Sequence, residues 1–112
     1  MTAYAMAQLR SVDLNAEIAE YLARIDDTLA PYEGRFLVHG RTPEVVDGSF
    51  EGIIVVIEFP SVERARAWYE SDAYQAIVGL RTRNSDGGAF IVEGVAPDYR
   101  AASFLEKMKG ST

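Results

Sequence analysis

The sequence predicts an α+β fold in which a four-stranded antiparallel sheet carries two helices on one face. The main evidence is the order of its segments, which alternate between strand-like and helix-like hydrophobic spacing as βαββαβ. Two split βαβ units with right-handed crossovers, the usual hand, give this sheet and place both helices on the same side. The 112 residues fit one domain with one modest core, which agrees with a single sheet.

The first strand and helix lie within the first 29 residues. Ala3–Leu9 is predicted to be a strand that is largely apolar on both faces and ends before polar residues. Helical spacing of apolar side chains then runs over Leu14–Leu29 and leaves charged residues off the apolar stripe. Asp13 and Asn15 are both candidates for the helix N-cap.

A hairpin with a long arm is predicted next. Pro31 and Gly34 bring the helix towards its end, and Arg35–His39 forms the second strand. The connection Gly40–Gly52 holds glycines, a proline and several acids. We expect it to contain a short edge strand at Glu44–Val46.

The second half of the pattern begins with the third strand, Ile53–Phe59, and continues into a helical region. Ser61 can cap a helix that continues to about Ser71. Asp72 either interrupts this helix or begins a second helical segment, Ala73–Arg81. Both alternatives keep one helical layer after the third strand.

The chain closes with a turn, a strand and a tail. The polar stretch Asn84–Gly88 predicts a turn, Ala89–Glu93 the fourth strand, and Tyr99–Lys109 a weakly amphipathic helix. We therefore expect a ferredoxin-like domain over residues 1–95 and a C-terminal tail with a short helix over residues 96–112.

The predicted sheet is apolar on both faces, whereas two helices can cover only one. In the third strand, Ile54 and Val56 share one face. The other face of that strand carries Ile53, Val55, Ile57 and Phe59. A second apolar face is a larger patch than a soluble monomer usually exposes, so we expect another subunit to cover it and predict a homodimer.

Composition excludes several classes of partner and chemistry. The formal net charge is −6 and the basic residues are scattered, which argues against nucleic acid as a partner. There is no cysteine, so disulfides, thiolate nucleophiles and cysteine-ligated metals are excluded. The chain opens with no secretory signal and contains no apolar stretch long enough to span a membrane, which predicts a soluble, cytoplasmic protein without a membrane partner.

Four stretches of the sequence carry a family resemblance: AYAMAQ, GRFLVHG, VVIEFPSVERARAWYESDAYQAIVGLR and FIVEG. Together they resemble a bacterial family of domains of unknown function, numbered thirteen-thirty, in the dimeric α+β barrel superfamily. The resemblance covers about Ala3–Gly94. Members often have Gly-Gly where this chain has Glu33-Gly34, a difference that concerns the turn before the second strand.

The resemblance implies that two ferredoxin-like sheets pair back to back into a dimeric α+β barrel. That expectation agrees with the two apolar faces of the predicted sheet. Relatives in the superfamily include cofactor-free monooxygenases, isomerases and haem enzymes. The family itself has no established activity to carry over to this chain.

His39, the sole histidine, is the first candidate catalytic residue. Imidazole titrates near neutral pH and is a natural proton shuttle, although a single histidine is more often structural or exposed. A metal site would need more ligands than one histidine, and only carboxylates remain to supply them. The sequence therefore predicts no metal site and no cofactor, haem included.

Glu58 is the second candidate catalytic residue. It follows Ile54 and Val56 on the same strand face, so its carboxylate lies at the end of an apolar row. Burial there would favour the protonated form and suit the side chain to general-base chemistry. The alternative is a structural salt bridge to an arginine. The candidates for that arginine are Arg35, Arg81 and Arg83.

The second helical region carries an aromatic and cationic set of candidate substrate-binding residues: Trp68, Tyr69, Tyr74 and Arg81. Trp68 and Tyr69 lie about 100° apart on a helix, so both cannot point into the core, and one should lie at a pocket mouth or subunit edge. The set either packs the core and the dimer interface, or lines a cleft for a flat apolar molecule that Arg81 clamps. Candidates for further hydrogen bonds in such a cleft are Gln8 and Tyr4.

Two classes of function follow. The protein is a small cofactor-independent enzyme that binds or transforms an apolar or aromatic carbonyl metabolite, with His39 or Glu58 abstracting a proton. Alternatively, it is a non-catalytic ligand-binding or structural dimer module whose polar residues pair with one another. A pocket large enough for a ring with an unpaired His39 or Glu58 favours the enzyme. A filled interior with Glu58 bridged to arginine favours the module.

Overall fold

The computed structural model describes residues 1–110, so residues 111–112 of the predicted tail lie outside the described part of the chain. Its elements follow the predicted order, with the second helical region divided in two and a helix in the tail. They are β1 Ala3–Val12, α1 Ala16–Leu29, the 3₁₀ helix η1 Ala30–Tyr32, β2 Arg35–Arg41, β3 Ile53–Phe59, α2 Val62–Glu70, α3 Asp72–Thr82, β4 Ser85–Glu93 and α4 Ala102–Gly110.

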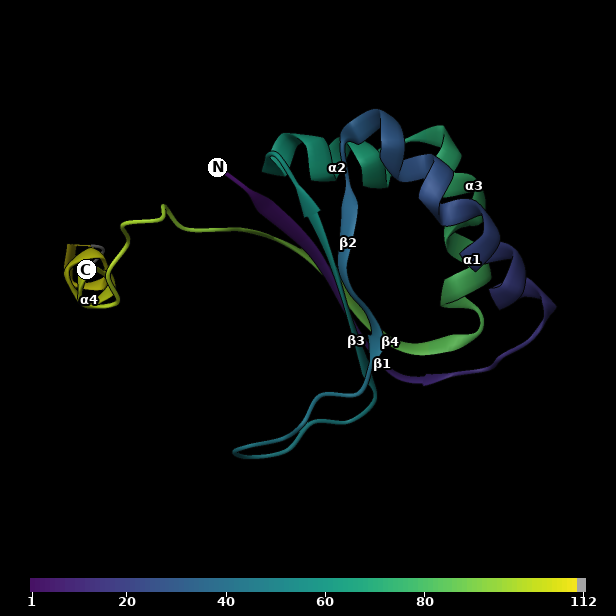
Figure 1. The fold of residues 1–112 in the computed structure, drawn as a ribbon, viewed down its shortest axis with the longest axis horizontal. Helices are drawn as coiled ribbons and strands as arrows, with labels where there is room; N and C mark the ends of the chain where they lie inside the picture. The colour runs from purple at the N-terminus through teal and green to yellow at the C-terminus, as the bar shows by residue number, and fades with distance from the viewer. Residues whose placement is uncertain (111–112) are drawn as a thin grey trace.

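The four strands form one antiparallel sheet in the order β2-β3-β1-β4. Figure 1 shows α1, α2 and α3 together on one side of this sheet. The predicted α+β, ferredoxin-like fold is therefore confirmed. We call the two sides of the sheet the helix face and the open face.

Strand β4 begins at Ser85, so the predicted turn over Asn84–Gly88 was wrong. The polar composition that suggested a turn belongs to a strand that lies very close to β1. A Cβ atom on Gly87 would overlap the backbone oxygen of Gln8, so glycine is what permits this pairing. Strand β1 is correspondingly longer than predicted and continues to Val12.

The connection between β2 and β3 contains no strand, so the edge strand expected at Glu44–Val46 is absent from this described segment. Figure 1 shows the connection as an arm that projects away from the helix layer. Val46 is 87% exposed there. Without a neighbouring strand, the β propensity of Val45-Val46 has no ladder to join.

Ser71 divides the second helical region into two helices, so Asp72 belongs to the start of a second helical segment. Its hydroxyl donates to the carbonyl of Trp68 at 2.7 Å and accepts from the Tyr74 backbone N–H at 3.2 Å. One residue therefore ends α2 and begins α3, with Asp72 in the first turn of the new helix. The break turns the aromatic side chains of the two helices towards each other.

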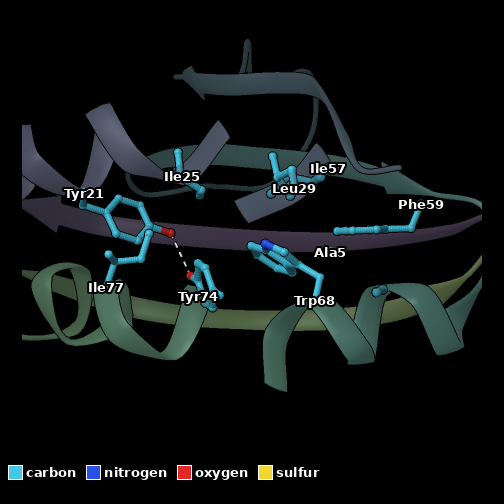
Figure 2. Packing of buried hydrophobic residues seen from close by; sticks show 10 residues of the cluster. Ala5, Tyr21, Ile25, Leu29, Ile57, Phe59, Trp68, Tyr74 and Ile77 are labelled. Carbon is cyan, nitrogen blue, oxygen red and sulfur yellow. Dashed lines mark hydrogen bonds between the residues drawn. The ribbon is translucent and has the colours of Figure 1, made fainter. Parts of the chain in front are cut away.

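The hydrophobic core lies between the helix face and the three helices (Figure 2). Phe59 and Ile77 are fully buried, and Figure 2 shows Trp68 of α2 between Tyr74 and Phe59. The Trp68 ring lies 4.2 Å from that of Tyr74 and 5.4 Å from that of Phe59, measured between centroids. This aromatic row joins the helix layer to the sheet and fixes the walls of the site described below.

The open face has no helix against it within residues 1–110 (Figure 1). Its side chains include Val92, which is 47% exposed, and Ile54 and Val56 from β3. Helix α4 stands apart from the body, at the end of the segment that follows β4 (Figure 1). Across these residues, no helix is long and apolar enough to cross a membrane.

Candidate ligand pocket

A pocket of about 480 Å³ lies between the helix face and the helix layer. Its floor comes from the four strands, chiefly from residues on the helix face, and its walls come from α1, α2 and α3. Most of these residues are apolar, including Ala5, Ile25, Val55 and Ile57. None of the residues that line the pocket is aspartate or glutamate. The polar lining is therefore rich in hydrogen-bond donors and contains no carboxylate.

The most buried polar groups of the pocket are two phenols. Tyr21, from the apolar stripe of α1, and Tyr74, from the first turn of α3, bring their hydroxyl oxygens to 2.7 Å (Figure 2). Both residues are at least 90% buried. One hydroxyl donates to the other, which leaves the second O–H free to donate to a third oxygen. Burial, with Tyr74 as a further cause, raises the pKa of Tyr21, so this phenol stays protonated near neutral pH.

Arg81 approaches the same pair from the last turn of α3. Burial works against its charge, but its interactions with Tyr74 and Tyr21 outweigh that effect and raise the pKa of Arg81. The guanidinium therefore remains charged and supplies N–H donors beside the two hydroxyls. We call Tyr21, Tyr74 and Arg81 the donor cluster.

Trp68 and Tyr69 are adjacent on α2 and point about 100° apart, so their rings lie in different surroundings. Trp68 is 4% exposed, and its indole N–H donates to the Thr28 hydroxyl at 2.9 Å. Tyr69 is 38% exposed and lines the pocket at its edge, with its ring 5.5 Å from that of Tyr74. One ring therefore belongs to the core wall and the other lies at the margin of the pocket.

His39 lies on β2 and lines the pocket from the helix face. Its ring packs against Phe36, with centroids 4.6 Å apart. Within residues 1–110 the imidazole forms no hydrogen bond or ion pair, so both ring nitrogens are available to a bound molecule. The structure thus brings His39, Trp68, Tyr69, Tyr74 and Arg81 to one cavity.

Glu58 lies on the other side of the sheet. Its carboxylate accepts from the Arg35 guanidinium at 2.8 Å, and its side chain is 28% exposed. Arg35 is one of the three partners that the sequence offered, so the salt-bridge alternative describes this side chain. Strand alternation explains the separation, because Glu58 and the pocket residue Ile57 are neighbours in β3 and point to opposite faces.

Tyr4 and Gln8 were also expected near the cleft, and the structure places them on the open face. Tyr4 pairs with Glu58 across the strands, and Gln8 donates to the backbone oxygen of Glu51 at 3.0 Å. The sequence correctly grouped these two residues on one face of β1. The polar side chains of Gln8 and Glu58 share this face, which agrees with its being the one that the helices leave uncovered.

Tyr21 is the residue that sequence analysis missed. It was assigned only to the apolar stripe of the first helix, which is correct for its ring. The phenol oxygen of Tyr21 meets that of Tyr74, 53 residues along the chain. No local sequence pattern predicts a contact between residues so far apart, although a buried tyrosine usually places its hydroxyl against a hydrogen-bond partner.

Within the described residues, no cluster of three or more histidine, cysteine, aspartate or glutamate side chains could hold a metal ion.

The fold and the pocket together define a small ferredoxin-like α+β protein with a donor-lined cavity between sheet and helices. Residues 2–95 match the model of a family described as a domain of unknown function, DUF1330. The chain belongs to that family, which agrees with the resemblance carried by its sequence motifs. No curated protein matches the chain.

Three solved structures illustrate what the fold is similar to. The RPA0582 protein of unknown function from Rhodopseudomonas palustris is 14% identical with a TM-score of 0.63, over 86% of this chain and 84% of that one. A dimeric ferredoxin-like protein of unknown function from Jannaschia sp. CCS1 is 13% identical with a TM-score of 0.60, over 84% and 100%. A mutant of SnoaB, a cofactor-independent oxygenase from Streptomyces nogalater, is 12% identical with a TM-score of 0.60, over 88% and 98%. At these identities the likeness is one of fold.

Proposed function

We propose that the pocket binds a flat, largely apolar metabolite and receives its carbonyl, enol or phenol oxygen at the donor cluster. The observation that carries this proposal is the absence of any carboxylate among the lining residues, while Arg81 and two phenols supply donors. Such a set suits an oxygen that is or becomes negatively charged. A cationic ligand would find no counter-charge in this cavity.

The dimensions of the pocket agree with a ligand of one or a few rings. A volume of about 480 Å³ lies within the range of ~300–1,000 Å³ typical of small-molecule sites. Trp68, Tyr69 and Tyr74 present ring surfaces along one wall. Aromatic walls favour flat ligands because offset ring stacking adds to the burial of apolar area.

We further propose that the reaction begins with proton transfer from the ligand to His39. The imidazole takes a proton from an acidic C–H or O–H, and the electron pair moves onto the ligand oxygen. Tyr21, Tyr74 and Arg81 then stabilise the resulting enolate or phenolate by hydrogen bonds. No cofactor is needed for this step.

The same deprotonated intermediate can lead to two outcomes. Return of the proton to another carbon isomerises the ligand. Alternatively, a deprotonated carbon that still bears a hydrogen adds dioxygen, as co-substrate, and a proton to form a hydroperoxide, which loses water and leaves a carbonyl at that carbon. The similarity of fold to SnoaB, described as a cofactor-independent oxygenase, favours the second outcome.

A non-catalytic ligand-binding module is the alternative, and the exposure of the His39 side chain on the strand at the sheet edge favours it. Binding is therefore measured separately from turnover. Calorimetry with a panel of fused-ring phenols and aromatic keto acids should detect a ligand for the unmodified chain. Turnover of that ligand is then followed by absorbance and oxygen consumption.

Arg81→Gln tests the donor cluster, and Arg83→Gln is its matched control because Arg83 pairs with Glu17 on the surface. We expect Arg81→Gln to weaken binding about tenfold or more, in line with the loss of a charge-assisted hydrogen bond, and Arg83→Gln to leave binding unchanged. His39→Ala should keep binding and abolish turnover in an enzyme. Equal effects of Arg81→Gln and Arg83→Gln would reject the proposed site.

We also propose that two copies of the chain associate through their open faces. The uncovered apolar side chains of that face support this, and so does the similarity to a ferredoxin-like protein described as dimeric. A two-fold pair of such sheets would be isologous, with the same patch on both copies. Sedimentation equilibrium should give twice the chain mass, and a monomer at micromolar concentration would contradict the proposal.

A further inference from the structure

We propose that helix α4 and the β2–β3 connection are two arms that clasp a second copy of this chain across the open face. The inference rests on the homodimer proposed above and adds how that dimer is held together. Neither segment lines the pocket, and the family resemblance assigns no role to either of them.

Helix α4 carries an apolar stripe that stays exposed in the described part of the chain. The stripe consists of Phe104, Leu105 and Met108, and Met108 follows Phe104 by four residues, so the three side chains lie along one side of the helix. Phe104, Leu105 and Met108 are each more than half exposed, and no residue of α4 is buried. Helices of this length are marginal in isolation, so an amphipathic one needs a surface on which to pack.

The segment before α4 sets it at a distance from its own domain. The backbone N–H of Gly94 donates to the oxygen of Thr2 at 2.7 Å, which anchors the start of the segment at the end of the sheet. Residues 94–101 then span up to ~26 Å when extended. Figure 1 shows α4 on the open-face side, well separated from the sheet.

The β2–β3 connection projects on the same side of the sheet as α4 (Figure 1). It too exposes apolar side chains, because Val45 and Val46 are 46% and 87% exposed and Phe50 is 36% exposed. Two arms on one side of a sheet, each with unpaired apolar residues, flank the space that a second sheet would occupy. Neither arm returns to its own helix layer.

The overall dimensions agree with arms that extend from a compact body. The radius of gyration is 16.1 Å, whereas a compact chain of this length would have one of about 13 Å. The longest dimension is 49 Å and the shortest 24 Å. The extra extent is what a partner between the arms would fill.

The flat outline of the open face is smaller than the accessible area that a typical interface buries, so contacts beyond the sheet would strengthen a dimer. Four strands about 4.8 Å apart, with about seven residues each at ~3.3 Å, give a projected area of roughly 440 Å². A typical specific interface buries about 800 Å² on each partner. The two arms supply the missing contact, and they explain why a short tail keeps three large apolar side chains.

The test compares the dimer dissociation constants of three proteins by sedimentation equilibrium. Phe104→Glu combined with Leu105→Glu places charge on the stripe, and Ser103→Glu places charge on the opposite side of the same helix. We expect the double variant to raise the dissociation constant about tenfold or more and Ser103→Glu to leave it unchanged. Retained circular dichroism of the sheet and core would show that the domain still folds.

The outcomes distinguish the two proposals. A monomeric unmodified chain would overturn both the homodimer and the clasp. A dimeric unmodified chain whose dissociation constant is unaffected by the double variant would overturn the clasp alone.

A second measurement locates the arm directly. The chain has no cysteine, so Ser103→Cys provides one attachment point for a spin label on α4. Labelled chains are mixed with isotope-labelled chains that carry no spin label. We expect line broadening in the isotope-labelled partner, since the arm of one copy reaches the other. Unbroadened signals throughout the isotope-labelled partner would contradict the clasp.

Discussion

The helix face and the open face of the sheet both carry apolar side chains, but only the helix face is covered by the chain's own helices within residues 1–110. In β3, Ile57 on the helix face is 4% exposed, whereas Ile54 on the open face remains partly exposed. Strand propensity and alternation are alike for the two. What distinguishes them is the layer against which each packs, since one face meets its own helices and the other meets none within the described chain. Apolar residues thus build a core on one face and, in the dimer that we propose, an interface on the other.

Ile57→Ala and Ile54→Ala form a matched pair on one strand and should show the largest difference. Ile57→Ala removes buried methyl groups and should cost about 2–5 kcal/mol of unfolding free energy at every protein concentration. Ile54→Ala should cost little within one copy and weaken only the dimer. Chemical denaturation at several protein concentrations measures both terms. Equal, concentration-independent losses would remove the distinction between the faces.

Tyr21→Phe tests the polar end of the pocket and should have a smaller effect than Ile57→Ala. Loss of the phenol breaks the hydrogen bond to Tyr74, which should cost about 0.5–1.5 kcal/mol of unfolding free energy. Denaturation at neutral pH measures this term, and an unchanged stability would mean that the buried bond contributes nothing.

The pH dependence of stability gives a second result for the same variant. Because burial raises the pKa of Tyr21, the neutral phenol stabilises the fold below pH ~10, and this contribution is lost as the pH rises beyond that value. The unmodified chain should therefore lose stability in strong alkali, and Tyr21→Phe should lose less. Parallel pH profiles would contradict the assignment of a raised pKa to Tyr21.

Glu33→Gly changes the turn before β2 and should affect neither face. Glu33 has a backbone φ of 60°, a left-handed conformation that glycine adopts more readily than other residues. The substitution should raise stability by up to about 1 kcal/mol. Thermal denaturation measures it, with dimer dissociation and ligand binding as controls that should not change.

A substitution at Gly34, the residue after Glu33, should instead lower the stability of the fold. A Cβ on Gly34 would come within 2.6 Å of the Phe59 ring and 2.9 Å of the Leu29 side chain. Gly34→Ala should therefore destabilise the fold by about 1–3 kcal/mol through overpacking. A stabilising effect of Gly34→Ala would show that this contact is not tight.

Glu58→Gln should have the smallest effect. The Arg35–Glu58 pair is partly exposed, and such pairs contribute about 0.2–1 kcal/mol. Because Glu58 lies on the open face, ligand binding in the pocket should not change. Loss of binding in Glu58→Gln, measured by calorimetry, would show that a residue on the open face affects the pocket on the helix face.

Much of the fold could be predicted from the sequence, because its signals are local. The third strand ends at Phe59 as predicted, and Ser61 caps the following helix by accepting from the Arg64 backbone N–H. The start of β4 was missed because Gly87 serves a close approach to β1, which is a contact between distant segments. A polar, glycine-rich stretch predicts a turn wherever such a contact is unknown.

Part of the candidate site could also be predicted, because some of its residues lie close together in the sequence. Trp68, Tyr74 and Arg81 belong to one helical region, so their grouping followed from sequence spacing. Tyr21 joins them only in three dimensions, and the choice between His39 and Glu58 depends on which sheet face the helices cover. Alternation along a strand separates two faces and does not identify the one that holds a pocket.

The most direct test of the central claim is a crystal structure of the chain with an aromatic phenol or keto acid selected by calorimetry. We expect the ligand to lie between the helix face and the helices, with its oxygen within hydrogen-bond distance of Tyr21, Tyr74 or Arg81. His39 should border the ligand, and Glu58 should not. A ligand bound on the open face, beside Glu58, would contradict this expectation.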